Sequence, residues 1–168
     1  MSDNNMLKMN KSIGIVTIVT SVIIIAIFLY FFIINSTKVP INCTADATMH
    51  YAEDTIQLTY TFRMNNGDGL VSMLGTLAHN KTEVGKISRQ TYFDYTTDRF
   101  YYHFVSTRVQ KSGINTVADD VLSKYTPDFF IKSGEVRDFD IIPTNRSGWV
   151  FLMHSIPFIQ CNNMLVVK

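Results

Sequence analysis

The sequence predicts an α+β protein in which an N-terminal transmembrane helix precedes a mostly antiparallel β-sheet, or partly open barrel-like domain, with one short helix. Two observations predict this fold class. Ser12 to Thr37 contains no Lys, Arg, Asp, Glu or His, and most of the chain after it alternates apolar and polar residues with the period of half-buried strands. The 168 residues suit one domain plus an appendage, because domains typically hold about 100 to 200 residues.

Residues 12–34 form the predicted membrane span, since a helix of roughly 20 apolar residues crosses a hydrocarbon core of about 30 Å. Lys8 and Lys11 precede this run, and Lys38 alone follows it closely. By the positive-inside rule, residues 1–11 stay in the cytoplasm as a short tail and the rest is exported. Residues 35–40 are then a linker and residues 41–168 a periplasmic β-rich domain.

A cleaved signal peptide and a buried core helix are the alternatives to this anchor. The apolar core of a signal peptide is shorter, at roughly 7 to 15 residues. The only small-residue triplet downstream, Ala45-Asp46-Ala47, lies too far beyond the run to serve as its cleavage site. We therefore expect an uncleaved signal anchor.

The first predicted pair of strands is a hairpin. Residues 56–64 alternate apolar and polar side chains, Asn65 to Gly69 supplies residues that tolerate positive φ, and residues 70–78 form the second arm. A polar connection over residues 80–85 leads to another alternating strand over residues 87–95, and a turn is expected at Thr97-Asp98.

The following strand, residues 99–109, is apolar on both faces and is expected in the centre of the sheet. Thr116 and Asp119 have the spacing of an acidic capping box, which predicts a short helix that ends before Pro127. Two last strands are predicted over residues 136–142 and 149–159, and Pro157 indicates an edge or a bulge in the second.

The two cysteines, Cys43 and Cys161, stand near the two ends of the exported part, outside any metal-binding spacing. We interpret them as a disulfide between the first and last exported strands, with two buried thiols as the alternative. By the chain-entropy model, a bridge across so long a loop contributes about 4 to 5 kcal/mol.

Charge and motifs exclude several functions. Fifteen Lys and Arg against 14 Asp and Glu leave no basic footprint for nucleic acid. The sequence lacks the common nucleophile, zinc-protease and phosphate-loop motifs. Asp138 and Asp140 share one face of a predicted strand, and a solvated strand face explains them better than a glycosidase pair does. We expect no enzyme activity, no cofactor and no metal.

Histidines and aromatic residues supply the remaining candidate sites. Imidazole titrates near pH 6.5, so any exported histidine is a candidate pH sensor, with ordinary packing or solvation as the alternative. Among the four, we expect burial to shift the pKa of the histidine in the aromatic strand most. That histidine is His103, and the others are His50, His79 and His154. The same strand offers Phe100, Tyr102 and Phe104 for the core or for a pocket holding a small apolar ligand.

The chain resembles the FidL-like family of bacterial inner-membrane proteins. A short tail, one anchor, an early and a late cysteine, residues 85–95, Phe100 to Phe104 and the ending Pro157 to Cys161 carry the resemblance. The resemblance implies an accessory protein that binds and stabilises the periplasmic domain of a ToxR-type, membrane-bound transcription regulator, as the functionally similar ToxS, VtrC, PsaF and MyfF do. It implies no catalytic residue.

A structural subunit of a pilus or secretion machine is the competing function. Pilins typically carry a Glu early in the helix, and Met1 to Ile15 contains none, which favours the accessory protein. If the chain is instead a non-bacterial membrane protein, Asn42, Asn80 and Asn145 are glycosylation acceptors.

Overall fold

The computed structural model describes residues 19–30, 40–144 and 148–164, and the chain divides into two compact units, Met1–Val39 and Pro40–Lys168. Residues 19–30 are helical with exposed side chains. The predicted tail, most of the linker and both ends of the predicted span lie outside the described residues. Within the described part, no helix is long and apolar enough to span a membrane.

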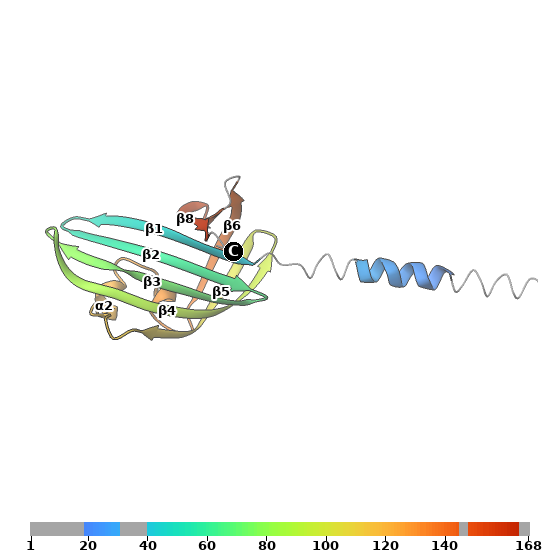
Figure 1. The fold of residues 1–168 in the computed structure, drawn as a ribbon, viewed down its shortest axis with the longest axis horizontal. Helices are drawn as coiled ribbons and strands as arrows, with labels where there is room; N and C mark the ends of the chain where they lie inside the picture. Colours follow the sequence, from blue (N-terminus) through green and yellow to red (C-terminus); the bar gives the residue numbers. More distant parts are fainter. Residues whose placement is uncertain (1–18, 31–39, 145–147, 165–168) are drawn as a thin grey trace, which may run out of the picture. The chain divides into compact units, whose positions relative to one another are not determined.

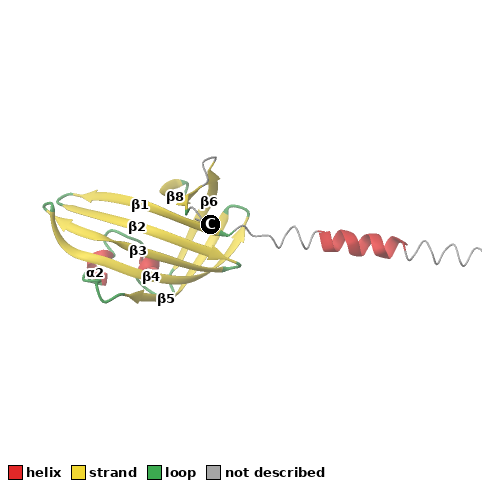
Figure 2. Ribbon diagram, viewed as in Figure 1, coloured by secondary structure: helices red, strands yellow, loops and turns green. Residues whose placement is uncertain are grey.

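The second unit is a closed barrel of eight antiparallel strands in sequential order (Figures 1 and 2). The helix α2 (Asp119–Leu122) and the 3-10 helix η1 (Asp128–Phe130) lie between the fifth and sixth strands. The strands are β1 (Ile41–Tyr51), β2 (Asp54–Asn65), β3 (Asp68–His79), β4 (Thr82–Asp98), β5 (Tyr101–Lys111), β6 (Val136–Thr144), β7 (Gly148–Met153) and β8 (Ile156–Asn163).

The predicted β2–β3 hairpin is confirmed. Asn66 and Gly67 form its two-residue turn with φ of 52° and 97°, the left-handed values that match the twist of paired strands. Asn80 and Lys81 make a similar turn, so β4 starts at Thr82, earlier than the predicted residue 87. The next turn follows Asp98, at Arg99 and Phe100, slightly later than predicted.

Three predictions of local structure are wrong. Residues 149–159 belong to two strands, because His154 and Ser155 adopt positive φ and reverse the chain. The capping box does not form, since Ala118 is the N-cap and the hydroxyl of Thr116 accepts a hydrogen bond from the Lys86 backbone instead. The strand β5 is not buried on both faces, because Tyr101 is exposed.

The bulge expected near Pro157 is present. The β7–β8 register changes between Phe151 and Leu152, so Phe158 has no direct partner across the ladder. Its ring lies 6.0 Å from that of Tyr60 and 6.2 Å from that of Phe130. The bulge therefore coincides with an aromatic contact in the barrel interior.

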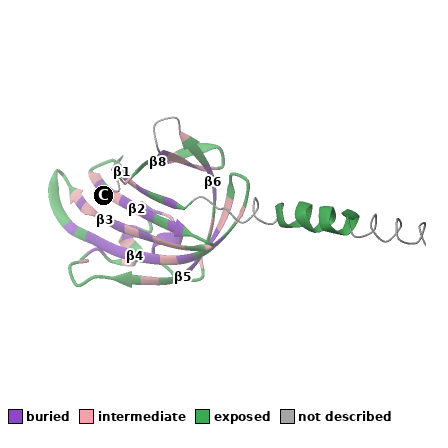
Figure 3. Ribbon diagram, turned by 45° about the vertical axis from the view of Figure 1, so that its right-hand side comes forward, coloured by how far each residue is buried: buried purple, intermediate pink, exposed green. Residues whose placement is uncertain are grey.

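Aromatic side chains fill the barrel. Fully buried rings come from both halves of the sheet and from η1, and successive ring centroids lie 4.5–5.8 Å apart from Phe93 through Phe104 and Phe129. Figure 3 shows the buried positions along the central strands. Eight strands enclose a space that side chains can fill, and here they do so. The other fully buried rings are Tyr60, Phe62, Phe130, Phe139 and Phe151.

Candidate functional site

A short ladder between the first and last strands, β1 and β8, closes the barrel. Between β1 and β8, the ladder contains Cys43 opposite Asn163 and Thr44 opposite Asn162. Cys43 and Cys161 form a disulfide there, with a Cα–Cα distance of 5.4 Å and a separation of 118 positions in sequence. The predicted bridge between the first and last strands of the domain is confirmed.

Beyond this closure, β1 has an unpaired edge. All its residues from Ile41 to Tyr51 pair with β2, but after Thr44 no described strand pairs with its other side. The carbonyl of Asn42 accepts a hydrogen bond from the Met164 amide across that side. Backbone groups alternate along a strand, so the amides and carbonyls of Asp46, Thr48 and His50 point to the same open edge.

A second open edge lies on β5. The strand β6 pairs only with Tyr101 to Val105, and Ser106 then exchanges hydrogen bonds with Gly134 and Glu135. From Thr107 to Lys111, no described strand pairs with the side facing away from β4. The Ser112 amide donates to Ser88 of β4, so alternation directs the Val109 amide to the open side.

The segment between β5 and β6, residues 112–135, closes the space between these two edges, and we call it the plug. It places Val117, Leu122, Phe129, Phe130 and Ile131 in the core. The plug fills the interior where the barrel lacks strand-to-strand closure.

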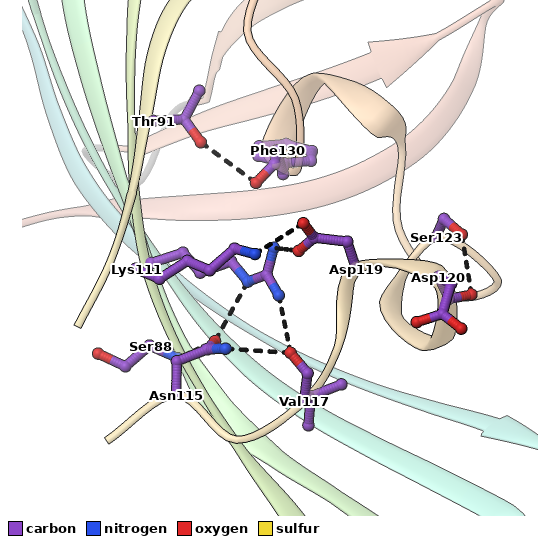
Figure 4. A network of polar contacts seen from close by, with 10 residues as sticks. Ser88, Thr91, Lys111, Asn115, Val117, Asp119, Asp120, Ser123 and Phe130 are labelled. Carbon is purple, nitrogen blue, oxygen red and sulfur yellow. Dashed lines mark hydrogen bonds and ion pairs between the residues drawn. The ribbon is translucent and has the colours of Figure 1, made fainter. Parts of the chain in front are cut away.

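Arg89 of β4 anchors the start of the plug from inside the barrel. Figure 4 shows its partners Asn115, Val117 and Asp119 gathered at this place. Its side chain is fully buried, and it donates to Asn115 Oδ1 at 3.1 Å and to the Val117 carbonyl at 2.9 Å. It also pairs with Asp119, whose other oxygen accepts a hydrogen bond from Lys111 at 2.7 Å. Partial burial acts to raise the pKa of Asp119, but the hydrogen bonds from Lys111 and Arg89 lower it overall.

A second polar cluster holds the later part of the plug to two hairpin turns. Asp54, at the start of β2, accepts a hydrogen bond from the Tyr125 hydroxyl and pairs with His79 Nδ1 at 2.7 Å. His79 Nε2 lies 3.5 Å from Glu53, and the rings of Tyr125 and Tyr51 are 5.2 Å apart. The hydrogen bond with Asp54 raises the pKa of His79, and those from Tyr125 and His79 lower the pKa of Asp54.

The four predicted histidines are not brought together. His103 is not buried among the aromatic residues, because strand alternation places it on the outer face, 41% exposed and 2.7 Å from Asp138. His50 contacts Thr55 at 3.1 Å, and His154 is exposed in the β7–β8 turn. Among the four, only His79 pairs with a residue, Asp54, that also contacts the plug.

The three aromatic candidates have different environments. Phe104 is fully buried among other rings, whereas Tyr102 is partly buried and packs against it with centroids 6.3 Å apart. Phe100 is 54% exposed in the β4–β5 turn and does not belong to the core.

Two shallow hollows lie on the outer face of the sheet, with volumes of about 460 and 430 Å³. Leu74 lines both, and most of the surrounding side chains are Ser, Thr and Gln. Neither hollow is the apolar interior pocket that the aromatic residues suggested. No cluster of His, Cys, Asp and Glu suited to a metal occurs among the described residues.

The sequence interpretation missed the two open edges and the Arg89 network. Arg89 did carry a signal, because it occupies an inward position in the alternation of Ile87, Thr91 and Phe93. A charged residue at such a position indicates a buried partner. The sequence of a single strand does not reveal an open edge, because an edge is defined by which strands pair in the folded sheet.

The fold and its edges define a class of protein: an eight-stranded antiparallel barrel tied by one disulfide, with an internal plug and two unpaired edges. Residues 40–161 match the family model of the YqeJ C-terminal domain, and the chain belongs to that family. The match runs from the first residue of the barrel unit to the second cysteine. No curated protein and no solved structure matches the chain.

Proposed function

We propose that the chain is a single-pass accessory protein of a bacterial inner membrane. Its β domain, in the periplasm, binds and stabilises the periplasmic domain of a ToxR-like, membrane-bound transcription regulator. The observation that carries this proposal is the open edge of β5. An unpaired edge in an otherwise closed barrel is a template for a strand of another chain.

The chemistry of the β5 edge favours a different chain as its partner. Residues 107–111 include the exposed Arg108 and no acidic residue, whereas Lys111 is already paired with Asp119. Two copies of this edge would bring like charges together, whereas a strand with Asp or Glu would complement them. The expected partner strand is therefore about five residues long and acidic on its outer face.

The polar cluster around His79 gives this module a pH-dependent contact. It joins the β1–β2 and β3–β4 turns to Tyr125 of the plug, and the plug adjoins the β5 edge. Loss of the His79 charge weakens this contact, so a rise in pH loosens the plug. The proposal assigns the chain no catalytic step.

Co-purification of the full chain with a full-length, membrane-bound regulator of this type from the same organism tests the proposal. Replacing Val109 with Pro removes the amide that points to the open side, without removing a β4–β5 hydrogen bond. We expect the regulator not to co-purify with V109P and to be degraded faster in cells that contain this variant. The V109A variant keeps the amide and is expected to retain both properties. Equal regulator recovery and lifetime with V109P, V109A and no accessory chain would contradict the proposal.

A further inference from the structure

The open edge of β1 has a sequence that complements itself. It spans residues 45–51, with Thr48 at its centre. We propose that two copies of this chain pair through this edge as antiparallel strands, with Thr48 of one copy opposite Thr48 of the second. The resulting dimer has two-fold symmetry, so the same residues are used on both sides.

The backbone supports this register. The amides and carbonyls of Asp46, Thr48 and His50 point to the open edge, as the bond between Asn42 and Met164 establishes. With Thr48 opposite Thr48, residue 46 of one copy faces residue 50 of the other. Each of these backbone groups then has a partner, and the whole open edge from Ala45 to Tyr51 is used.

The side chains complement one another in the same register. On the outer face, Asp46 lies opposite His50 of the second copy, an acid beside a base. On the inner face, small residues meet large ones: Ala47 lies opposite Met49, and Ala45 opposite Tyr51. Shifting the strands by two residues either way replaces the Asp46–His50 pair with Asp46–Thr48 or Thr48–His50. A shift of four places Asp46 opposite Asp46 or His50 opposite His50.

Asp46 and His50 are already positioned for this pairing. Both residues are exposed on β1. The hydroxyl of Thr59 donates to Asp46 Oδ1 at 2.6 Å, and His50 Nδ1 lies 3.1 Å from the hydroxyl of Thr55. These contacts orient the two side chains and leave Asp46 Oδ2 and His50 Nε2 for the second copy. Less side-chain freedom is then lost when the copies associate.

The dimer does not rest on the proposed function. It uses the β1 edge, whereas the regulator is assigned to the β5 edge. A dimer therefore leaves both β5 edges open and would bring two regulators together.

Disulfide trapping of the full-length chain tests the register. Paired residues on adjacent antiparallel strands have Cα atoms about 5.5 Å apart, within the range that a disulfide bridges. We expect T48C to give a covalent dimer under mild oxidation. The two native cysteines do not compete for this cross-link, because they are already bonded to each other. The matched control is Q57C, which lies opposite Thr48 on β2 and is also exposed, but is one strand away from the open edge. Failure of T48C to cross-link, or equal cross-linking of Q57C, would overturn the proposal.

A second pair of variants tests whether the edge itself holds the dimer. T48P removes the amide that points outward and spares the β1–β2 ladder, whereas T48A keeps that amide. In sedimentation of the detergent-solubilised full chain, we expect T48A to stay a dimer and T48P to become a monomer with its native disulfide formed. A folded T48P that remains a dimer would refute the model. If T48P does not fold, the cross-linking result decides. Regulator co-purification with T48P is expected to persist, which separates this inference from the proposed function.

Discussion

At the scale of single residues, the polar side chains inside the domain connect segments that lie far apart in the sequence. Asp54 begins β2, yet its two oxygens contact His79, at the end of β3, and Tyr125, in the plug. Arg89 likewise joins β4 to Asn115, Val117 and Asp119. These side chains determine where the plug sits, because strand pairing leaves it no ladder of its own.

The first prediction concerns pH. The pKa of His79 is raised from 6.5 in the folded protein, so its contribution to stability is complete below about pH 6.5 and disappears as the pH rises through the folded value. The pKa of Asp54 is lowered from 3.8, so its contribution is lost only in stronger acid. We expect the melting temperature of the wild type to fall between about pH 6 and pH 8 more than that of H79Q.

H103Q is the matched control in a second measurement, hydrogen exchange in the plug as a function of pH. His103 also pairs with an aspartate at 2.7 Å, but across adjacent strands and away from the plug. Hydrogen exchange in residues 112–135 should therefore depend on pH in H103Q as in the wild type. The same pH dependence in H79Q would exclude His79 as its source.

At the scale of elements, the strands were largely predictable, because each hairpin combines a period of two with a turn. The pair Asn66-Gly67 predicts its turn, since both residues tolerate positive φ. His154 and Ser155 form a turn with positive φ although neither is Gly or Asn, so the sequence predicts one strand where the structure has the β7–β8 hairpin. His103 was placed inside because its neighbours are aromatic, although alternation with buried Phe104 points it outward.

The plug could not be predicted from local sequence. Its helices contain only four and three residues, too few for a helical period to establish. Its position depends on contacts such as that of the Thr91 hydroxyl with the Phe130 carbonyl, at 3.3 Å. Residues 39 positions apart make this contact, so no short window of the sequence contains it.

The second prediction tests the anchor of the plug. R89M removes all the hydrogen bonds of a fully buried guanidinium and leaves the Val117 carbonyl and Asp119 with fewer partners. We expect a loss of about 3 kcal/mol in the free energy of unfolding, measured by urea denaturation, since breaking one side of a buried pair is costly. Hydrogen exchange should increase first in residues 112–135. R63M, at an exposed position of β2, is expected to change stability by less than about 0.5 kcal/mol. Equal effects of R89M and R63M would contradict the anchoring role.

At the scale of the whole molecule, the barrel depends on a narrow closure. The strands β1 and β8 share only two residue pairs, whereas β1 and β2 pair over their full length. A short ladder alone is weak, so the disulfide between Cys43 and Cys161 supplies a large part of the connection. The third prediction follows from this arrangement.

Replacing both cysteines with Ala should lower the free energy of unfolding by about 4 to 5 kcal/mol, the chain-entropy value for a loop of this length. Urea denaturation under non-reducing conditions measures the difference. Reducing agent should destabilise the wild type and leave the double variant unchanged. A wild type whose unfolding is insensitive to reduction would show that the bridge adds no stability.

The same closure can form only late in the synthesis of the chain. Cys43 is made 118 residues before Cys161. At about 5 to 20 residues per second, that interval lasts roughly 6 to 24 seconds. During this time the hairpins from β1 to β5 can pair with their sequence neighbours, but the barrel has no last strand with which to close. Until Cys161 is made, the newborn domain is therefore an open sheet with the Cys43 thiol unbridged at one margin, and the bond that completes the closure forms only when an oxidant takes two electrons from the two thiols.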